Sequence, residues 1–431
     1  MSKNQDVTNL KPTLYAEDVA FAVTPKEKQV ISAENVAFKI GKDNKLPKHK
    51  GADDYSDEAV SERIVWLEKT KNISLQHISA NSEKITNFQG NIETPIGVAQ
   101  IPLGIAGPIK VKGEFAKGEY YVPMATTEGV LLTSFRVGMK VLNNAGGVDV
   151  KVTQNVMHIT SLFIINSINE CQKLMDFINN EFEKIKEAAE MKTKFGKLKS
   201  AETMFCSNGV LIKFIYDTKD AMGMNMINIA TKMACEYISK ETNLKKYYVR
   251  SNYSSDKKFS YTNNSKGYGK EVFAKITLSK EDLRLLRISP KELFDFYTYS
   301  LGSAIRGGMI GFNGQVVNGI TAIFIACGQD VAQILHSASS VSGVSLNDDG
   351  TVSISIYVPN LLVGTVGGGT SLGTQKECLK IMQCYGSGNV NKFAEIIVAT
   401  ILAGELSISA SLANGSFFQA HEMMGRNRPK E

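Results

Sequence analysis

The stretch "SNYSSDKK" (251–258) and the carboxylate of Asp330 are the first places in the sequence where charged side chains suggest chemistry. Lys257 offers a cation in a polar turn, and a fixed cation can stabilise a developing oxyanion. Asp330 ends the apolar run "TAIFIACGQD", so we expect its carboxylate to be partly buried, where an unpaired charge is costly. Pairing with Lys257 would relieve both groups and couple their titrations. The alternatives are a solvated turn lysine and an exposed aspartate at the end of a helix or strand.

The stretch "DAMGMNM" (220–226) surrounds Gly223 with an acid and three methionines. One interpretation is a buried helix start, because aspartate is a good N-cap and methionine fills irregular gaps in a core. The other is a phosphate site, since unpaired N–H groups and the helix dipole attract anions and a glycine allows their close approach. The choice depends on the elements around this stretch.

Residues 158–250 have the pattern of a small α/β unit. "HITSLFIIN" predicts a strand, and residues 169–190 place apolar side chains on one helical stripe. "AETMFCSNGVLIKFIYD" predicts a hairpin that turns at 207–209. A helix over 222–240 and the strand "KKYYVR" complete the order β-α-β-β-α-β, the ferredoxin-like split pattern. "DAMGMNM" then begins the second helix of this unit, which favours the phosphate-binding interpretation.

The chain's 431 residues exceed one ordinary core, so two or three domains are expected. Residues 1–55 are polar and lysine-rich, which indicates a poorly ordered extension plus a short helix. Ser56 and the acids after it resemble a helix cap, and they open a helical segment over 56–95. Residues 96–157 and 251–431 make the predicted large domain, with the small unit inserted in it. The predicted fold class is therefore α/β, of the mixed α+β type.

Composition narrows the class of protein. Apolar residues make up 43% of the chain and charged residues 21%, as in soluble globular proteins. Basic residues exceed acids by six in a scattered way, which suits anionic small ligands better than nucleic acid. Six cysteines without a CxxC pair indicate free thiols in a reducing, cytoplasmic compartment. The most apolar segments are too short for a membrane span or carry Glu395 and Glu405, no signal core is present, and no cluster has metal-ligand spacing.

Six short blocks occur in a characteristic order: "PMATTEG" (123–129), "DAMGMNM", "SNYSSDKK", "IACGQD" (325–330), "GTVGGGT" (364–370), and "AGELS" with the later "AH" (403–421). Together they resemble 3-hydroxy-3-methylglutaryl-CoA (HMG-CoA) reductase over about residues 90–425, in the class typical of eukaryotes and many archaea. The resemblance implies NADPH-dependent four-electron reduction of HMG-CoA to mevalonate and CoA, a step of isoprenoid synthesis.

By this resemblance four residues carry the chemistry. Lys257, paired with Asp330, lies at the carbonyl oxygen. Glu128 protonates the oxygen at the aldehyde stage, which requires a raised pKa; otherwise it is a helix-starting glutamate in a capping position. His421, in "FFQAHEMMGRNRPKE", protonates the departing CoA thiolate from a C-terminal flap, a task that the near-neutral pKa of a histidine suits. A surface or packing histidine is the alternative.

The resemblance also implies two sets of binding residues. "KTKFGKLK" (192–199) supplies contacts to the 2′-phosphate of NADPH, a cation there favouring NADPH over NADH; a solvated basic loop is the alternative. The cofactor-binding residues are Thr193, Lys194, Asp220, Met222, Gly223, Met224, Asn225, Met226, Gly367, Gly368 and Gly369. The substrate-binding residues are Ser134, Arg250, Ser251, Asn252, Asp256, Lys258 and Asn318.

The sequence departs from the family pattern at the substrate anchors. Where the family has "DGMTR", with an arginine for the substrate carboxylate, this chain has "NVMHITS", with His158 and Ile159. Arg250 stands instead before "SNYSSDKK" and could bind the same carboxylate bidentately. The family's "STNRG" is "SFRVG" (134–138), with its arginine one place earlier at Arg136.

The resemblance places the active site between two subunits, so the expected partners are HMG-CoA, CoA and a second copy of the chain, in a homodimer or homotetramer. Two other interpretations stay open. One is a related reductase that uses NADH or a different acyl-CoA. The other is a non-catalytic binding protein on the same scaffold, against which the four intact candidate residues argue.

Overall fold

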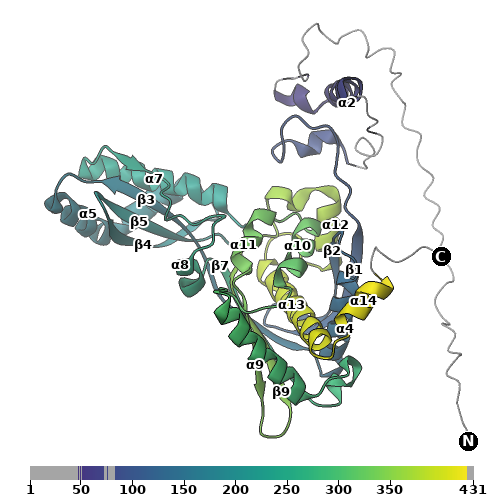
Figure 1. The fold of residues 1–431 in the computed structure, drawn as a ribbon. Helices are drawn as coiled ribbons and strands as arrows, with labels where there is room; N and C mark the ends of the chain where they lie inside the picture. The colour runs from purple at the N-terminus through teal and green to yellow at the C-terminus, as the bar shows by residue number, and fades with distance from the viewer. Residues whose placement is uncertain (1–46, 48, 50, 72–74, 76–82, 425–431) are drawn as a thin grey trace, which may run out of the picture.

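The computed structural model describes residues 47, 49, 51–71, 75 and 83–424 (Figure 1). The strands are β1 (Leu103–Lys112), β2 (Lys117–Ala125), β3 (Val148–Ile164), β4 (Lys197–Cys206), β5 (Gly209–Asp217), β6 (Tyr247–Tyr248), β7 (Gly269–Leu278), β8 (Val341–Leu346) and β9 (Val352–Leu361). The α-helices are α2 (Asp57–Lys71), α4 (Leu131–Asn144), α5 (Ile168–Asn180), α6 (Phe182–Glu190), α7 (Met224–Thr242), α8 (Tyr261–Lys266), α9 (Pro290–Arg306), α10 (Val316–Ala326), α11 (Ile334–Ser337), α12 (Gly373–Ile381), α13 (Val390–Ala413) and α14 (Phe417–Met424). The 3-10 helices are η1 (Gly51–Tyr55), η2 (Ile85–Phe88), η3 (Asp282–Leu286), η4 (Val331–Gln333) and η5 (Gly368–Ser371).

A large mixed sheet runs in the order β2-β1-β3-β7-β9-β8. Its neighbours are antiparallel except β1 and β3, which pair in parallel. The core under this sheet includes side chains of α4, α10 and α13. Helices α4 and α13 cross so closely at Gly138 that a side chain there would collide with the backbone of Ala403, which explains the glycine.

Strand β3 belongs to two sheets. Its first half pairs with β7 up to Val156, and from Met157 onward it pairs with β5 and β6. The second sheet therefore has the order β4-β5-β3-β6, and in Figure 1 it projects with α5 and α7 from the larger body. Although the predicted domain boundary lies at 157/158, the strand continues through it without a break.

The small unit has the element order predicted from the sequence, with one difference. Strands β3, β4, β5 and β6 alternate with helices in the β-α-β-β-α-β order, and the hairpin turns between Cys206 and Gly209. The apolar stripe predicted over 169–190 is carried by two helices instead of one, because Glu181 departs from helical geometry between α5 and α6. Leu174 and Ile185 are nevertheless both buried in the same core.

Helix α13 lies in the middle of the large core and carries two buried glutamates. Glu395 accepts hydrogen bonds from the backbone N–H groups of residues 114–116, between β1 and β2. Glu405 accepts from the N–H groups of Gly314 and Gln315 and from the Ser342 hydroxyl. Burial raises the pKa of both carboxyls, while the donors around them favour the ionised form. Each glutamate thus fixes a distant loop to the central helix.

Among the residues that the structure describes, α13 is the one helix long and apolar enough to cross a membrane by composition. Of its most apolar window, 72% is buried inside the fold, as in the core helix of a globular protein. The six cysteines are free; five are buried and Cys206 is half-buried.

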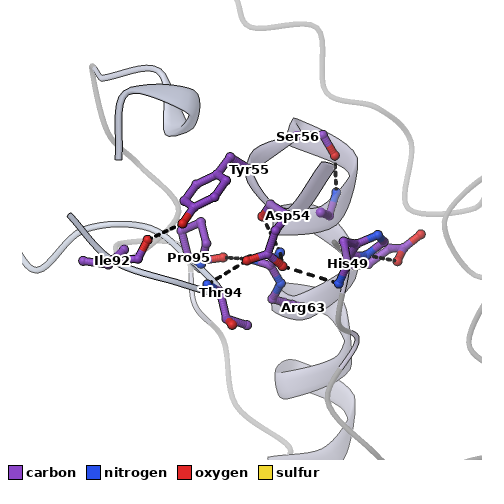
Figure 2. A network of polar contacts seen from close by, with 10 residues as sticks. His49, Asp54, Tyr55, Ser56, Arg63, Ile92, Thr94 and Pro95 are labelled. Atoms are coloured by element: carbon purple, nitrogen blue, oxygen red, sulfur yellow. Dashed lines mark hydrogen bonds and ion pairs between the residues drawn. The ribbon is translucent and has the colours of Figure 1, made fainter. Parts of the chain in front are cut away.

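One buried arginine, Arg63, holds the described part of the N-terminal segment together (Figure 2). Arg63 on α2 is fully buried and donates to the Asp54 carboxylate at 2.8 Å and to the carbonyl of Pro95. The N–H of Thr94 donates to the other Asp54 oxygen at 2.9 Å, and the Tyr55 hydroxyl donates to Ile92. A buried carboxylate of this kind needs such donors. Helix α2 and the chain near 92–95 are thereby held together.

Within the segment predicted as a poorly ordered extension plus a short helix, residues 51–55 form the short helix η1, because Asp54 and Tyr55 are buried in the contacts just described. Residues 1–46, 48 and 50 lie outside the described part of the chain. The predicted cap at Ser56 is confirmed, since its hydroxyl accepts from the N–H of Ala59 at 3.1 Å.

Candidate active site

The loop 251–258 is fixed to β3 and presents Lys257. The backbone and hydroxyl of Ser251 both donate to the carbonyl of Thr160, and the Thr160 N–H donates to Ser254. The Lys257 ammonium lies 3.0 Å from the Asp330 carboxylate, with side chains 51% and 31% exposed. The predicted ion pair is therefore present, and it remains open enough for a ligand to approach the lysine.

Asp256, next to Lys257, is held on both carboxylate oxygens. Gln333 donates to one oxygen at 2.8 Å, and the Arg250 guanidinium donates to the other at 3.1 Å. Arg250 also makes a long contact of 3.4 Å with Asn228 on α7. Sequence reasoning missed Gln333, although its spacing of three residues from Asp330 places the two in one helical turn.

Lys258 and Asn252 form a second contact within the loop, where the Lys258 ammonium donates to the Asn252 amide oxygen at 3.1 Å. Loop 251–258 therefore collects four of the predicted substrate contacts, Ser251, Asn252, Asp256 and Lys258, and Arg250 directly precedes it. They lie in one stretch of chain beside the Lys257–Asp330 pair, as their spacing in the sequence requires.

Glu128 lies in a different place in the same chain. Its carboxylate accepts from the Asn318 amide on α10 at 3.2 Å, and both line a cavity of about 220 Å³. Asp330 follows the other end of α10, and the nine residues from Asn318 to Ala326 span about 12 Å of helix. One chain therefore brings together two pairs of candidate residues, Glu128–Asn318 and Lys257–Asp330, at opposite ends of α10.

His421 lies on α14, near the C-terminal end of the described chain. Its backbone is helical, and its side chain lies outside the described atoms. The predicted role of His421 therefore stays a prediction.

The start of α7 is capped by a glycine and not by the aspartate. Gly223 is the N-cap, with φ of +88° and no side-chain cap, and a side chain on it would collide with Thr218. Asp220 instead faces α13, where its carboxylate accepts from the N–H of Val390 at 3.2 Å. The interpretation of Asp220 as an N-cap is wrong, because the chain turns once more before the helix begins.

Three of the predicted cofactor segments meet at this helix start. Residues 192–199 approach it where Gly196 packs against Met226, and the Thr193 hydroxyl accepts from the Gly196 N–H. The glycine-rich stretch 364–370 approaches from the other side, where the N–H of Thr365 donates to the Asp220 carbonyl at 2.8 Å. Close contacts between Gly328 and Gly369 then join this stretch to the "IACGQD" block.

The remaining members of the predicted cofactor set surround this meeting point. Met222, Met224, Asn225 and Met226 lie on or just before the first turn of α7; Met224 is buried and Asn225 is exposed. Gly367 and Gly368 are exposed, with no atoms packed against their Cα positions. Lys194 is exposed to solvent. The glycine-rich stretch is therefore accessible to a ligand at Gly367 and Gly368.

A fully buried lysine lies beside this helix start, and sequence reasoning missed it. The Lys270 ammonium donates to the Asn155 amide oxygen at 3.2 Å. Burial lowers the pKa of Lys270 to about 8, against the opposing effect of Asp220 and Asp217. No sequence signal marks a single lysine at the start of a strand as buried.

The position where the family carries its substrate arginine lies inside the fold. Ile159 is fully buried, and the His158 ring is buried 4.6 Å from the ring of Tyr268. Burial, aided by the charge of Lys213, lowers the pKa of His158 to about 3, so its imidazole is neutral at physiological pH. His158 therefore cannot replace the arginine as a cation.

Ser134 lies on α4, within hydrogen-bonding distance of Ser407 and Gln315. On the same helix, Arg136 and Lys140 line a separate open groove of about 460 Å³. The groove presents two cations without an acidic lining residue. Within the described part of the chain, no group of three or more histidine, cysteine or acidic side chains could hold a metal ion.

Comparison with known proteins identifies the family. The hydroxymethylglutaryl-coenzyme A reductase profile matches residues 59–426. A relative with the name 3-hydroxy-3-methylglutaryl-coenzyme A reductase, from Methanocaldococcus jannaschii, is 39% identical over 84% of this chain and 92% of its own. Another, from Methanothermobacter thermautotrophicus, is 40% identical over 86% and 94%.

A solved structure has the same fold. The class II HMG-CoA reductase of Streptococcus pneumoniae, described as bound to NADPH in open conformations, matches with a TM-score of 0.61 at 18% identity, over 82% of this chain and 96% of that one. The chain is an α/β oxidoreductase. It belongs to the HMG-CoA reductase family.

Proposed function

We propose that this protein reduces HMG-CoA to mevalonate and free CoA, with two NADPH. The observation that carries the proposal is the Lys257–Asp330 pair at 3.0 Å, in a chain that belongs to this family. Reducing a thioester to an alcohol passes through a hemithioacetal and an aldehyde, and each hydride addition puts negative charge on the carbonyl oxygen. The Lys257 ammonium offsets that charge, and Asp330 holds the ammonium in place.

Protons are needed at two other points. Glu128 would protonate the oxygen at the aldehyde stage, and His421 would protonate the thiolate as the hemithioacetal collapses. Because the resemblance to the family places the active site between two subunits, we propose that a second copy contributes to each site. Exposed apolar side chains at Ile101, Leu103 and Val317 beside the Glu128 cavity support a homodimer or a homotetramer.

NADPH, when bound, supplies one hydride to each reduction step. The start of α7 fits its phosphates, because no side chain caps the first N–H groups of the helix. Gly367, Gly368 and Gly369 would flank the nicotinamide end. Lys194 and Thr193 would meet the 2′-phosphate, which NADH lacks. The cytoplasm, whose reducing conditions suit six free cysteines, is the proposed location.

Lys194→Ala is expected to raise the KM for NADPH about tenfold, the effect of losing one charged hydrogen bond, and to leave the KM for NADH unchanged. Steady-state kinetics with both cofactors measure this. Lys173→Ala, an exposed lysine of α5, is the matched control and should change neither constant. An equal rise for NADPH and NADH would contradict a 2′-phosphate contact.

The substrate's free carboxylate would bind at Arg250 and Lys258, with Ser251, Asn252, Asp256 and Asn318 contacting the rest of the acyl group. Arg250 uses two N–H groups on Asp256 and Asn228, and a guanidinium has five. Its side chain is 38% exposed, so donors remain for a ligand. Arg136 and Lys140 in the open groove, with Ser134 nearby, would hold the CoA phosphates.

Arg250→Ala is expected to raise the KM for HMG-CoA about 10- to 100-fold, which corresponds to roughly 1.5–3 kcal/mol for a hydrogen bond to a charged group. The KM for NADPH should change little. Arg250→Lys keeps the charge without the planar fork and should fall between the two. If Arg250→Ala left the KM for HMG-CoA intact or raised only that for NADPH, the carboxylate would have to bind elsewhere.

The overall proposal is tested by following NADPH absorbance after HMG-CoA is added. Two NADPH should be consumed for each mevalonate formed. Turnover with NADH alone, or with another acyl-CoA and not HMG-CoA, would support the related reductase instead. Binding of HMG-CoA without turnover under any of these conditions would make the chain a binding protein on this scaffold.

A further inference from the structure

Two consecutive loop residues contact the two ends of one helical turn. Lys257 lies 3.0 Å from Asp330, the N-cap of η4, and Asp256 accepts from Gln333, the last residue of η4, at 2.8 Å. The turn between them is short and internally bonded, since the N–H of Gln333 donates to the carbonyl of Asp330. The loop therefore meets η4 at two points and not one.

The backbone at Lys257 explains how neighbouring side chains reach the same turn. In an extended chain successive side chains point to opposite sides. Lys257 instead has φ of +56°, in the left-handed region that residues other than glycine rarely adopt. Such a conformation persists only when surrounding contacts fix it. Those contacts are the backbone hydrogen bond of the turn itself, from the Lys258 N–H to the Ser255 carbonyl at 2.9 Å, and the contacts that Asp256 and Lys257 make with η4.

Gln333 is fully buried, and its amide is only half used. Its nitrogen donates to Asp256, while its oxygen has no hydrogen-bond partner among the described residues. A buried amide with an unpaired oxygen is costly, so a purely structural position would favour an apolar side chain of the same shape. The donor end, directed at Asp256, is the feature that an apolar residue could not supply.

We infer that Gln333 is a positioning residue for Lys257: by holding Asp256 it fixes the left-handed turn that aims the ammonium at the reacting oxygen. The inference rests on the proposed function of Lys257 and adds a residue that does not touch the substrate. Arg250 holds the other oxygen of Asp256, so the carboxylate cannot rotate while both donors are in place.

Gln333→Met keeps the volume and removes the donor. It should lower kcat about 10- to 100-fold, the range for misplacing a catalytic group, while the KM for NADPH and the thermal midpoint stay near wild type. Asn360→Leu is the matched control, because Asn360 is also a buried amide with an unpartnered oxygen but donates to Ser339 and not to the loop. Its kcat should change less than threefold.

Gln333→Glu separates positioning from packing. An ionised glutamate would repel Asp256, whereas a protonated one would donate a hydrogen bond to it. When two carboxylates lie this close, the pKa of one of them is raised, because both cannot easily be ionised at once. The ratio of variant to wild-type kcat should therefore rise about tenfold from pH 8 to pH 6. Of the other groups near Asp256, burial raises the pKa of Tyr268 and lowers that of His336 to about 4, so neither would cause a change between pH 8 and pH 6.

The inference also has a test independent of turnover. Lys257 held by Asp330 should react slowly with an amine-acylating reagent, and peptide mass analysis should find it several-fold more reactive in Gln333→Met. Failure of the wild type to reduce HMG-CoA would overturn the proposed function and not this inference. Equal acylation of Lys257 in wild type and Gln333→Met, or a pH-independent ratio for Gln333→Glu, would overturn the inference.

Discussion

Lys257→Ala is expected to lower the kcat for HMG-CoA reduction by about 10² to 10³, the usual effect of removing one donor to an oxyanion. The loss should be large because Asp330 would remain beside the reacting oxygen without its counter-charge. The carboxylate would then oppose the negative charge that each hydride addition creates. The KM for NADPH should stay near its wild-type value, since the cofactor site proposed at the start of α7 does not include this loop.

Circular dichroism and thermal melting would establish that the variant is folded. Lys266→Ala, an exposed lysine at the end of α8, is the matched control and should keep full activity. Asp330→Asn offers a second arm, because it leaves the ammonium without its carboxylate partner and should also reduce kcat. Activity of Lys257→Ala within tenfold of wild type would exclude the oxyanion role.

The small α/β unit could be predicted because its signals are local. The apolar stripe of α5 and α6, the hairpin between β4 and β5, and the helix after "DAMG" each follow from periodicity and turn residues within a few positions. The continuity of β3 across both sheets could not be predicted, since its pairing partners in β5 and β7 lie 45 (Ile164 and Gly209) to 126 (Asp149 and Lys275) residues away in the sequence. The break at Glu181 likewise has no glycine or proline to announce it.

Some contacts of the candidate site could likewise be predicted from the sequence, and others could not. The Lys257–Asp330 pair was predictable because an aspartate at the end of an apolar run needs a counter-charge, and the resemblance of "SSDKK" to the family's block indicated Lys257. The Asp256–Gln333 contact was not, because it depends on the left-handed backbone of Lys257, which no residue type in "SSDKK" indicates. Burial of Lys270 also depends on packing between strands and on no local pattern.

The position of Glu128 carries the strongest consequence for the assembly. Within one chain Glu128 contacts Asn318 near the start of α10, and Lys257 pairs with Asp330 after its end. A proton donor must lie within hydrogen-bonding reach of its acceptor. We propose that Glu128 of a second subunit supplies the proton to each site. Mixing two inactive variants, Glu128→Gln and Lys257→Ala, should restore up to about a quarter of the activity in a shared-site dimer, by random assortment of subunits.

His421→Gln is expected to lower the kcat for HMG-CoA about 10²-fold and to leave the reduction of free mevaldehyde within a few-fold of wild type. General acid catalysis typically contributes 10² to 10⁴ in rate. Collapse of the hemithioacetal expels a thiolate that must be protonated before it can re-add to the aldehyde, and His421 would supply that proton. Mevaldehyde has no thiolate to lose, so the histidine has no task in its reduction.

The two substrates therefore separate the leaving-group role from every general defect. A damaged α14, a displaced substrate or a loss of stability would slow both reactions, because both use the Lys257 side of the site. Glu422→Gln, the exposed neighbour on the same helix, is the matched control and should leave both rates unchanged. Only the reduction of the thioester releases a thiolate that His421 would protonate. Aldehyde reduction should therefore become the faster half of the reaction in His421→Gln. Equal losses on HMG-CoA and mevaldehyde would remove His421 from the leaving-group role and would place the proton donor on another residue.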